Sequence, residues 1–184
     1  MNPTIVAMNE KMDHSMEAFR RELTKIRTGR ASLNLLDGIK VTAYGSSMLL
    51  NQVANLTIPE SRMIVIQPWD TQLLAAIEKA IFASDIGLNP SNDGKVIRIS
   101  IPQLTEERRK ELVKQVKKIS EEYRVAIRNC RRDALDALKK QKGNKELPED
   151  EFFKLQDEAQ KATDQHIKKI DEIMAEKEKE VMEV

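Results

Sequence analysis

Three long amphipathic patterns, interrupted by a segment of different periodicity, constrain the fold of this 184-residue chain most strongly. Apolar residues recur every three or four positions over residues 5–26, 112–138 and 152–181, and this spacing predicts three long helices. Apolar seams of this length cannot all stay in water, so we expect the helices to pack as a bundle. The seam residues are Ile5, Met8, Met12, Met16, Phe19, Leu23 and Ile26 in the first helix, Leu112, Val116, Ile119, Tyr123, Ile127, Cys130, Ala134 and Leu138 in the second, and Phe152, Leu155, Ala159, Ala162, His166, Ile170, Ile173 and Val181 in the third.

Residues with capping and helix-ending preferences mark the predicted ends of these helices. We expect the first helix to stop at Thr28-Gly29, because glycine readily takes the left-handed conformation that follows a helix. Thr105 is expected to cap the start of the second helix, with two glutamates in its first turn, and Gly143-Asn144 to end it. The third helix is predicted to begin near Pro148.

The middle of the chain has a different character, since Gly, Pro, Asn and Ser gather there and the apolar pattern alternates. The alternation predicts strands over 38–43, 53–58, 63–66 and 96–101. A short helix is expected over 70–83 and a turn over 89–94. The predicted fold class is α+β, a long three-helix bundle with an inserted small α/β domain made of a β-sheet and a short helix. The predicted boundaries are 1–29 and 105–184 for the discontinuous bundle, 30–104 for the insertion, and 28–31 and 101–104 for a hinge of two short connections.

Several classes of function are excluded or disfavoured by composition and motifs. The single cysteine rules out an internal disulfide and fits a reducing compartment, and no apolar run is long enough to span a membrane. The N-terminal residues lack the pattern of a secretion signal, so we expect a cytoplasmic protein. No phosphate-binding loop or catalytic motif is present, and His14, His166 and Cys130 are interpreted as helix-packing or surface residues. We therefore expect no enzymatic activity.

The net charge of +1 conceals an uneven distribution along the chain. Residues 108–142 hold thirteen basic and five acidic residues, whereas residues 146–184 hold six basic and thirteen acidic ones. On a helical wheel, the basic residues of the second helix gather on one flank of its seam. Between Lys110 and Arg132, Glu121 is the only acidic residue in this arc. The arc contains Lys110, Lys114, Lys117, Arg124, Arg128, Arg131 and Arg132.

Two interpretations of this basic flank stay open on charge sorting alone. In the first, it pairs with acidic residues of the third helix, and such exposed pairs contribute only about 0–1 kcal/mol each. In the second, it follows the phosphates of a nucleic acid, for which arginine offers a two-pronged donor. No aromatic residue lies within the flank, so the backbone of folded, double-helical RNA is favoured over stacked single strands. The acidic residues concerned are Asp157, Glu158, Asp164, Asp171 and Glu172.

Four segments resemble those of one protein family. They are FRRELTKIRTGRA at 19–31, ASDIGLNP at 83–90, PQLTEERRK at 102–110 and RNCRRDA at 128–134. In sequence, order and spacing they are similar to segments of bacterial ribosome recycling factors, and the resemblance extends over the whole chain.

The resemblance implies a function and a set of residues. It implies an L-shaped, transfer-RNA-like molecule that binds the post-termination ribosome. With elongation factor G and GTP, such a factor separates the subunits and frees mRNA and tRNA. It further implies contacts with large-subunit ribosomal RNA at intersubunit bridges. We also expect a monomer without cofactor or metal. The RNA contacts carry over to Arg128, Arg131, Arg132, Arg124, Arg27 and Arg30, and the hinge to Thr28, Gly29, Ala31, Pro102 and Gln103.

Two other functions are compatible with the pattern of helices and charge. A coiled-coil-like protein-binding or chaperone module would use exposed apolar seams to recruit a helical partner. A simple RNA-binding module would use the basic flank but need no GTPase.

Overall fold

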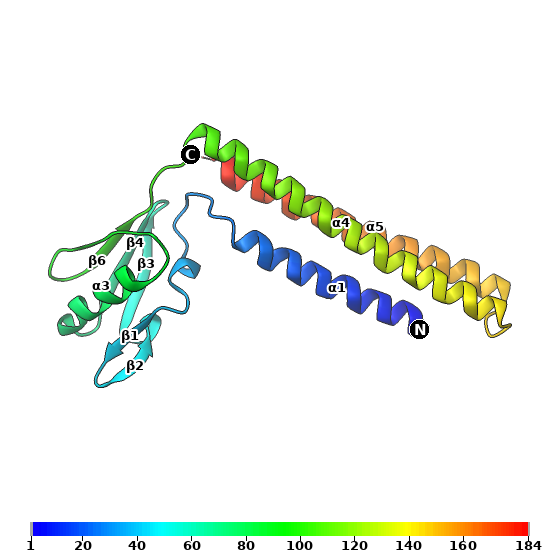
Figure 1. Ribbon diagram of the computed structural model, residues 1–184, viewed down its shortest axis with the longest axis horizontal. Helices are drawn as coiled ribbons and strands as arrows, with labels where there is room; N and C mark the ends of the chain where they lie inside the picture. Colours follow the sequence, from blue (N-terminus) through cyan, green and yellow to red (C-terminus); the bar gives the residue numbers. More distant parts are fainter. Residues whose placement is uncertain (1, 184) are drawn as a thin grey trace. The chain divides into compact units, whose positions relative to one another are not determined.

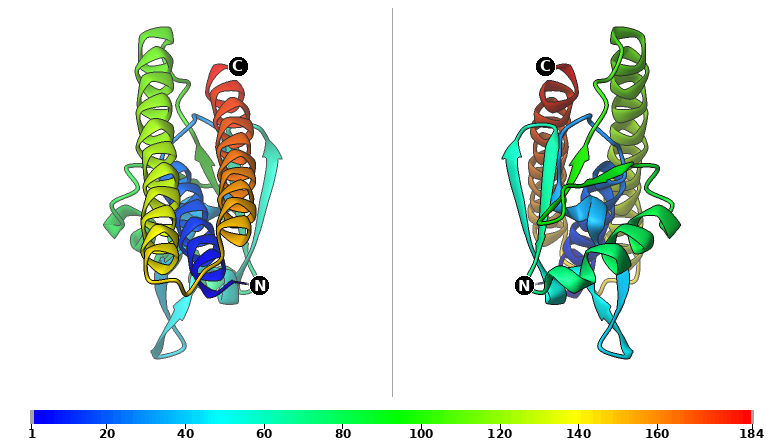
Figure 2. Two further views of the ribbon diagram at one scale, coloured as in Figure 1. Left: turned by 90° about the vertical axis from the view of Figure 1, so that its right-hand side faces the viewer. Right: turned by 90° about the vertical axis from the view of Figure 1, so that its left-hand side faces the viewer.

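The computed structural model describes residues 2–183, which form two compact units. One unit combines the chain up to Thr28 with the chain from Thr105 onward, and the other is the continuous segment Gly29–Leu104. The first unit is a bundle of three helices: α1 (Pro3–Thr24), α4 (Glu106–Gly143) and α5 (Glu149–Met182). Figures 1 and 2 both show these helices side by side.

The ends of the bundle helices follow local capping rules. The Asn2 side chain accepts a hydrogen bond from the Thr4 backbone N–H at 2.9 Å, and Thr105 accepts one from the Arg108 N–H at 3.2 Å. Helix α4 ends at Gly143, and α5 begins directly after Pro148. The predicted caps and boundaries of the second and third helices are therefore confirmed.

The first helix ends earlier than predicted, at Thr24 rather than at Thr28-Gly29. The backbone leaves the helix after Lys25, and Thr28 is buried where its hydroxyl donates a hydrogen bond to Glu180 Oε1 at 3.0 Å. A tertiary contact with α5 thus holds the segment that sequence pattern alone would continue as helix. Gly29 has φ of +77°, so its left-handed conformation serves the following turn instead of the helix end.

The predicted seams form the core of the bundle, and two buried hydroxyl residues join them. Ser120 and Thr163 are both fully buried. The Ser120 hydroxyl donates to the Val116 carbonyl at 2.8 Å, and the Thr163 hydroxyl donates to the Ala159 carbonyl at 2.7 Å. Because each hydroxyl donates a hydrogen bond within its own helix, these residues can lie in the core. A search for apolar residues alone does not find such positions. The seams face one another, so the helices do not offer the exposed seams expected of a module that recruits a partner helix.

The second unit is small and contains two antiparallel sheets. Strands β1 and β2 form a hairpin, and the other four strands pair in the order β3-β4-β6-β5. Helix α3 packs against this unit's core (Figure 1), in which Ile77 and Ile81 lie among buried strand residues. The elements are η1 (Leu33–Leu36), β1 (Lys40–Ala43), β2 (Ser46–Leu49), α2 (Leu50–Val53), β3 (Ala54–Glu60), β4 (Met63–Pro68), η2 (Thr71–Leu73), α3 (Leu74–Ala83), β5 (Pro90–Asn92) and β6 (Ile97–Ser100).

The four predicted strands and the helix are confirmed, but β2 and β5 were not expected. Strand β2 is mostly exposed and has no strong alternation, because it pairs only with β1 at the edge of the hairpin. Strand β5 begins at Pro90 and lies in the segment predicted as a turn. Its strand conformation depends on pairing with β6, with Pro90 opposite Ile99. Neither strand has an alternating apolar pattern of its own. Each takes the strand conformation because it pairs with a neighbouring strand.

In the described part of the chain, no helix combines the length and the apolar character that crossing a membrane requires.

Candidate nucleic-acid interface

The four arginines at 124, 128, 131 and 132 lie within little more than two turns of the long helix α4. Their spacing places them on one flank of the helix, beside the seam that packs into the bundle core. They nevertheless differ in exposure and in partners. These differences decide which of them can meet an external phosphate.

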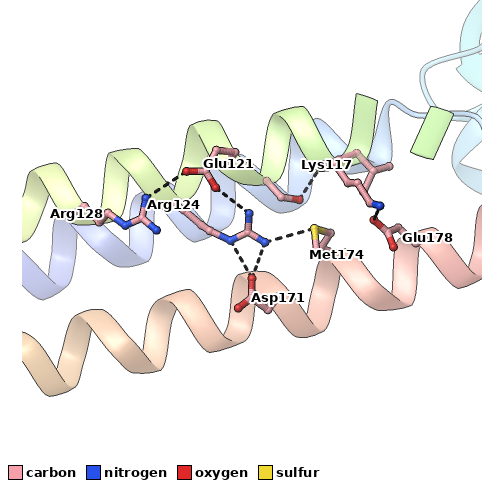
Figure 3. Close-up of polar contacts among 9 residues, drawn as sticks. Lys117, Glu121, Arg124, Arg128, Asp171, Met174 and Glu178 are labelled. Atoms are coloured by element: carbon pink, nitrogen blue, oxygen red, sulfur yellow. Dashed lines mark hydrogen bonds and ion pairs between the residues drawn. The ribbon is translucent and has the colours of Figure 1, made fainter. Parts of the chain in front are cut away.

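Arg124 reaches from α4 to Asp171 of α5 and leaves only 17% of its side chain exposed. Its Nε and Nη2 atoms donate to Asp171 Oδ1 at 2.8 and 2.6 Å, and Nη1 donates to Glu121 Oε2 at 3.0 Å (Figure 3). Burial opposes the charge, but the hydrogen bonds to Asp171 and Glu121 outweigh it and raise the pKa of Arg124 above its ordinary value. The intramolecular interpretation therefore holds for Arg124, which ties α4 to α5.

Arg128 is more exposed, at 47% of its side chain, and pairs with the same carboxylate. Its Nη1 donates to Glu121 Oε1 at 3.1 Å. Hydrogen bonds from Arg124 and Arg128 lower the pKa of the Glu121 carboxyl, so this carboxylate stays ionised. Figure 3 shows Glu121 between the two guanidinium groups.

Arg131 and Arg132 have neutral partners. Arg131 Nη1 donates to the Gln160 side-chain oxygen of α5 at 2.5 Å, and Arg132 Nη2 donates to the Asn129 side-chain oxygen at 3.2 Å. An amide oxygen orients a guanidinium group without cancelling its charge. These two arginines therefore combine a fixed orientation with a charge that these contacts leave uncompensated.

An open depression of about 350 Å³ lies along this part of α4. It brings three of the predicted arginines together with Lys139, which the sequence analysis did not include. Lys139 follows Arg132 by seven residues, so extending the same helical periodicity by two turns could have identified it. The lining residues are Val125, Arg128, Asn129, Arg131, Arg132, Leu135, Asp136 and Lys139.

The other two predicted RNA-binding arginines are exposed but separate from this depression. Arg27 precedes Thr28, which contacts Glu180, whereas Arg131 contacts Gln160, twenty positions earlier on α5. This difference corresponds to about 30 Å along the helix axis. Arg30 belongs to the other compact unit. The structure thus groups Arg128, Arg131 and Arg132, and does not add Arg27 to that group.

The predicted hinge residues differ in how firmly they are held. Thr28 is anchored on the bundle through Glu180, as described above. Within the inserted unit, the Ala31 N–H donates to the Ser61 carbonyl at 2.7 Å, and the Ile101 N–H donates to the Arg62 carbonyl at 2.8 Å. These anchors leave Gly29–Arg30 and Pro102–Leu104 between them, and both Pro102 and Gln103 are exposed.

The two histidines and the cysteine differ in burial and in partners. His166 is buried, with Nδ1 at 2.7 Å from the Ala162 carbonyl and Nε2 at 3.0 Å from Asp13 Oδ1, and this confirms its packing role. His14 is exposed. Cys130 is half-buried, and burial raises the pKa of its thiol, which disfavours the nucleophilic thiolate. Among residues 2–183, no group of three or more His, Cys, Asp or Glu side chains could hold a metal ion.

Comparison with known proteins points to a single family. The model of the family described as ribosome recycling factor matches residues 19–182. A ribosome-recycling factor of Desulfotalea psychrophila is 66% identical over 184 residues and covers all of both chains. One of Geobacillus thermodenitrificans is 58% identical over 175 residues, which cover 95% of each chain.

Two solved structures agree with these sequence relatives. A solution structure of the ribosome recycling factor is 40% identical, with a TM-score of 0.78 and full coverage of both chains. The second consists of models for the T. thermophilus ribosome recycling factor and the E. coli elongation factor G bound to the E. coli post-termination complex. It is 48% identical, has a TM-score of 0.63, and covers 98% of this chain and 97% of that chain.

Proposed function

Because this chain belongs to the ribosome recycling factor family, we propose that it binds the post-termination ribosome and, with elongation factor G and GTP, separates its subunits. Separation frees mRNA and tRNA for a new round of translation. The relative that is 48% identical occurs with elongation factor G on a post-termination complex, and this supports the choice of partner. The place of action is the ribosome in the cytoplasm, and the active form is a monomer.

The proposed RNA contact rests on the contacts and position of Arg131 and Arg132. Both guanidinium groups are oriented by neutral amides beside an open depression and so keep their charge available. Arginine binds phosphate through two parallel hydrogen bonds, and this geometry suits the backbone of folded RNA. We place large-subunit ribosomal RNA, at the intersubunit bridges, against this surface. Arg128 and Lys139 extend it, whereas Arg124 serves the bundle.

The proposed mechanism is mechanical. The bundle acts as a stiff rod, because long helices packed along their length resist bending. Elongation factor G pushes on the factor, and the two connections bend so that the inserted domain reorients while the rod displaces RNA at a bridge. Since Thr28, Ala31 and Ile101 are each anchored within their own unit, we assign the bending to Gly29–Arg30 and Pro102–Leu104. GTP hydrolysis belongs to the partner.

Light scattering of post-termination ribosomes tests this function directly. We expect scattering to fall when the chain, elongation factor G and GTP are all present, because separated subunits scatter less than intact ribosomes. Mixtures lacking any one component serve as controls and are expected to keep their scattering. Unchanged scattering with a folded chain and an active GTPase would remove the recycling function and leave simple RNA binding.

A further inference from the structure

Glu121 is the acidic residue that interrupts the basic flank of α4. Its side chain is 54% exposed, so it contributes a negative charge to a surface proposed to meet phosphates. Each carboxylate oxygen has its own partner: Oε2 lies 3.0 Å from Arg124 Nη1, and Oε1 lies 3.1 Å from Arg128 Nη1 (Figure 3). The carboxylate therefore bridges two arginines that differ in role.

Arg124 does not depend on this carboxylate to keep its place. Its Nε and Nη2 atoms both reach Asp171, and Nη2 also lies 3.4 Å from the Met174 sulfur. Arg128 is different, because its Nη1, one of the donors that a phosphate would use, donates to Glu121. The contact with Glu121 therefore matters more for Arg128 than for Arg124.

Carboxylates and phosphodiesters offer a guanidinium group the same chemistry, two anionic oxygens that accept parallel hydrogen bonds. One Nη1 group cannot donate fully to both anions, so its contact with Glu121 weakens any contact with a phosphate. We propose that Glu121 competes with RNA phosphate for Arg128 and thereby limits the affinity of the basic flank. This inference rests on the proposed contact with ribosomal RNA. Its consequence is a complex that dissociates faster than the arginines alone would allow.

The test compares Glu121→Gln with Glu111→Gln in binding to vacant ribosomes over a series of KCl concentrations. Glu111 is a matched control, since it lies on α4, is 53% exposed and pairs with Arg108 at 2.8 Å, but faces the opposite flank. We expect Glu121→Gln to bind about fivefold more tightly at low salt, the effect of one unit charge a few ångströms away in water. The dependence of log K on log salt is expected to become steeper by about 0.9. Glu111→Gln is expected to bind like the unchanged chain.

A second comparison shows whether the effect passes through Arg128. In an Arg128→Ala background, the guanidinium group for which Glu121 and phosphate compete is absent. Glu121→Gln is therefore expected to give no gain in affinity. A gain that persists in this background would overturn the proposal, as would Glu121→Gln that binds no better than Glu111→Gln. Circular dichroism of each variant confirms that the helices are intact.

The outcomes also separate this inference from the proposed function. If the unchanged chain shows no salt-dependent binding to ribosomes, the RNA contact itself fails and the competition fails with it. If the unchanged chain binds but both glutamine variants are equal, only the role of Glu121 is overturned.

Discussion

At the scale of single residues, the partner of each arginine matters more than its position on the helical wheel. Arg124 and Arg131 lie on the same flank of α4 and both reach α5, but one meets the Asp171 carboxylate and the other the Gln160 amide. The first charge is cancelled and largely buried, while the second is oriented and retained. The intramolecular interpretation therefore holds for Arg124, and the proposed RNA contact rests on Arg131 and Arg132.

Replacing Arg131 and Arg132 with Ala is expected to weaken ribosome binding and flatten its salt dependence. Each lost phosphate contact reduces the magnitude of the slope of log K against log salt concentration by about 0.9, because fewer counterions are released on binding. Sedimentation with ribosomes over a salt series measures both quantities.

The control removes two exposed cations of the same helix, Arg108 and Lys118, which lie away from the depression. This variant has the same net charge as the double arginine variant. An equal loss of slope in both would indicate general attraction to RNA and contradict a specific phosphate contact.

At the scale of elements, the turn before β6 is ordered by one carboxylate. Asp93 Oδ1 accepts hydrogen bonds from the backbone N–H groups of Lys95 and Val96, each at 2.9 Å, and the other oxygen pairs with Arg98. The backbone hydrogen bonds, followed by Arg98, lower the pKa of Asp93 to about 2. This network holds a polar loop that leads into the β5–β6 pairing.

Acid is expected to remove the contribution of Asp93 to stability. Its pKa is lowered on folding, so the ionised carboxylate stabilises the fold above the ordinary value of 3.8, and this effect is lost as pH falls toward about 2. Asp93→Asn should therefore be less stable than the unchanged chain at neutral pH and equally stable near pH 2. Urea unfolding, followed by the amide NMR signals of the β6 residues Ile97 and Ile99, measures the difference.

Asp85→Asn provides a control in the same unit, since Asp85 is exposed and lies outside this turn. A stability difference for Asp93→Asn that stays constant from neutral pH to pH 2 would contradict an origin in the carboxylate charge.

At the scale of the whole molecule, the proposed hinge depends on a close approach of its two connections. Gly29 has φ of +77°, and a Cβ atom there would lie 2.9 Å from Leu104 Cγ, closer than side chains tolerate. Glycine is needed at this position for its conformation and for its lack of a side chain. A larger residue would press on the second connection as well as strain the first.

Gly29→Ala is expected to leave both units folded but to slow subunit separation. Gly45 offers a matched control, because it also has φ of +77° but a Cβ atom there would meet nothing within 4 Å. Both alanine variants carry a backbone cost of about 1–2 kcal/mol, so a difference between them isolates the contact with Leu104. Stopped-flow light scattering with elongation factor G and GTP gives the rates. Equal rates for the two variants would argue against bending at Gly29.

Much of the architecture could be predicted because it depends on local rules. Apolar residues at helical spacing, Thr105 before two glutamates, and Pro148 after Gly143-Asn144 determine three helices wherever they finally pack. The alternating segments determine four strands in the same way. Such local rules do not predict strands β2 and β5. Strand β2 takes its conformation from pairing with β1, and β5 from pairing with β6.

By itself the sequence determined the bundle, the insertion and the sorting of charge onto one flank of α4. Tertiary structure alone decided the partner of each arginine, because Arg124 and Asp171 are 47 residues apart and Arg131 and Gln160 are 29 apart. It also holds Thr28, which lies beyond the end of the first helix at Thr24, against Glu180 of α5. Periodicity specifies the direction in which a side chain leaves its helix. The group it meets depends on how the neighbouring helix is packed, and that packing is settled only when the chain folds.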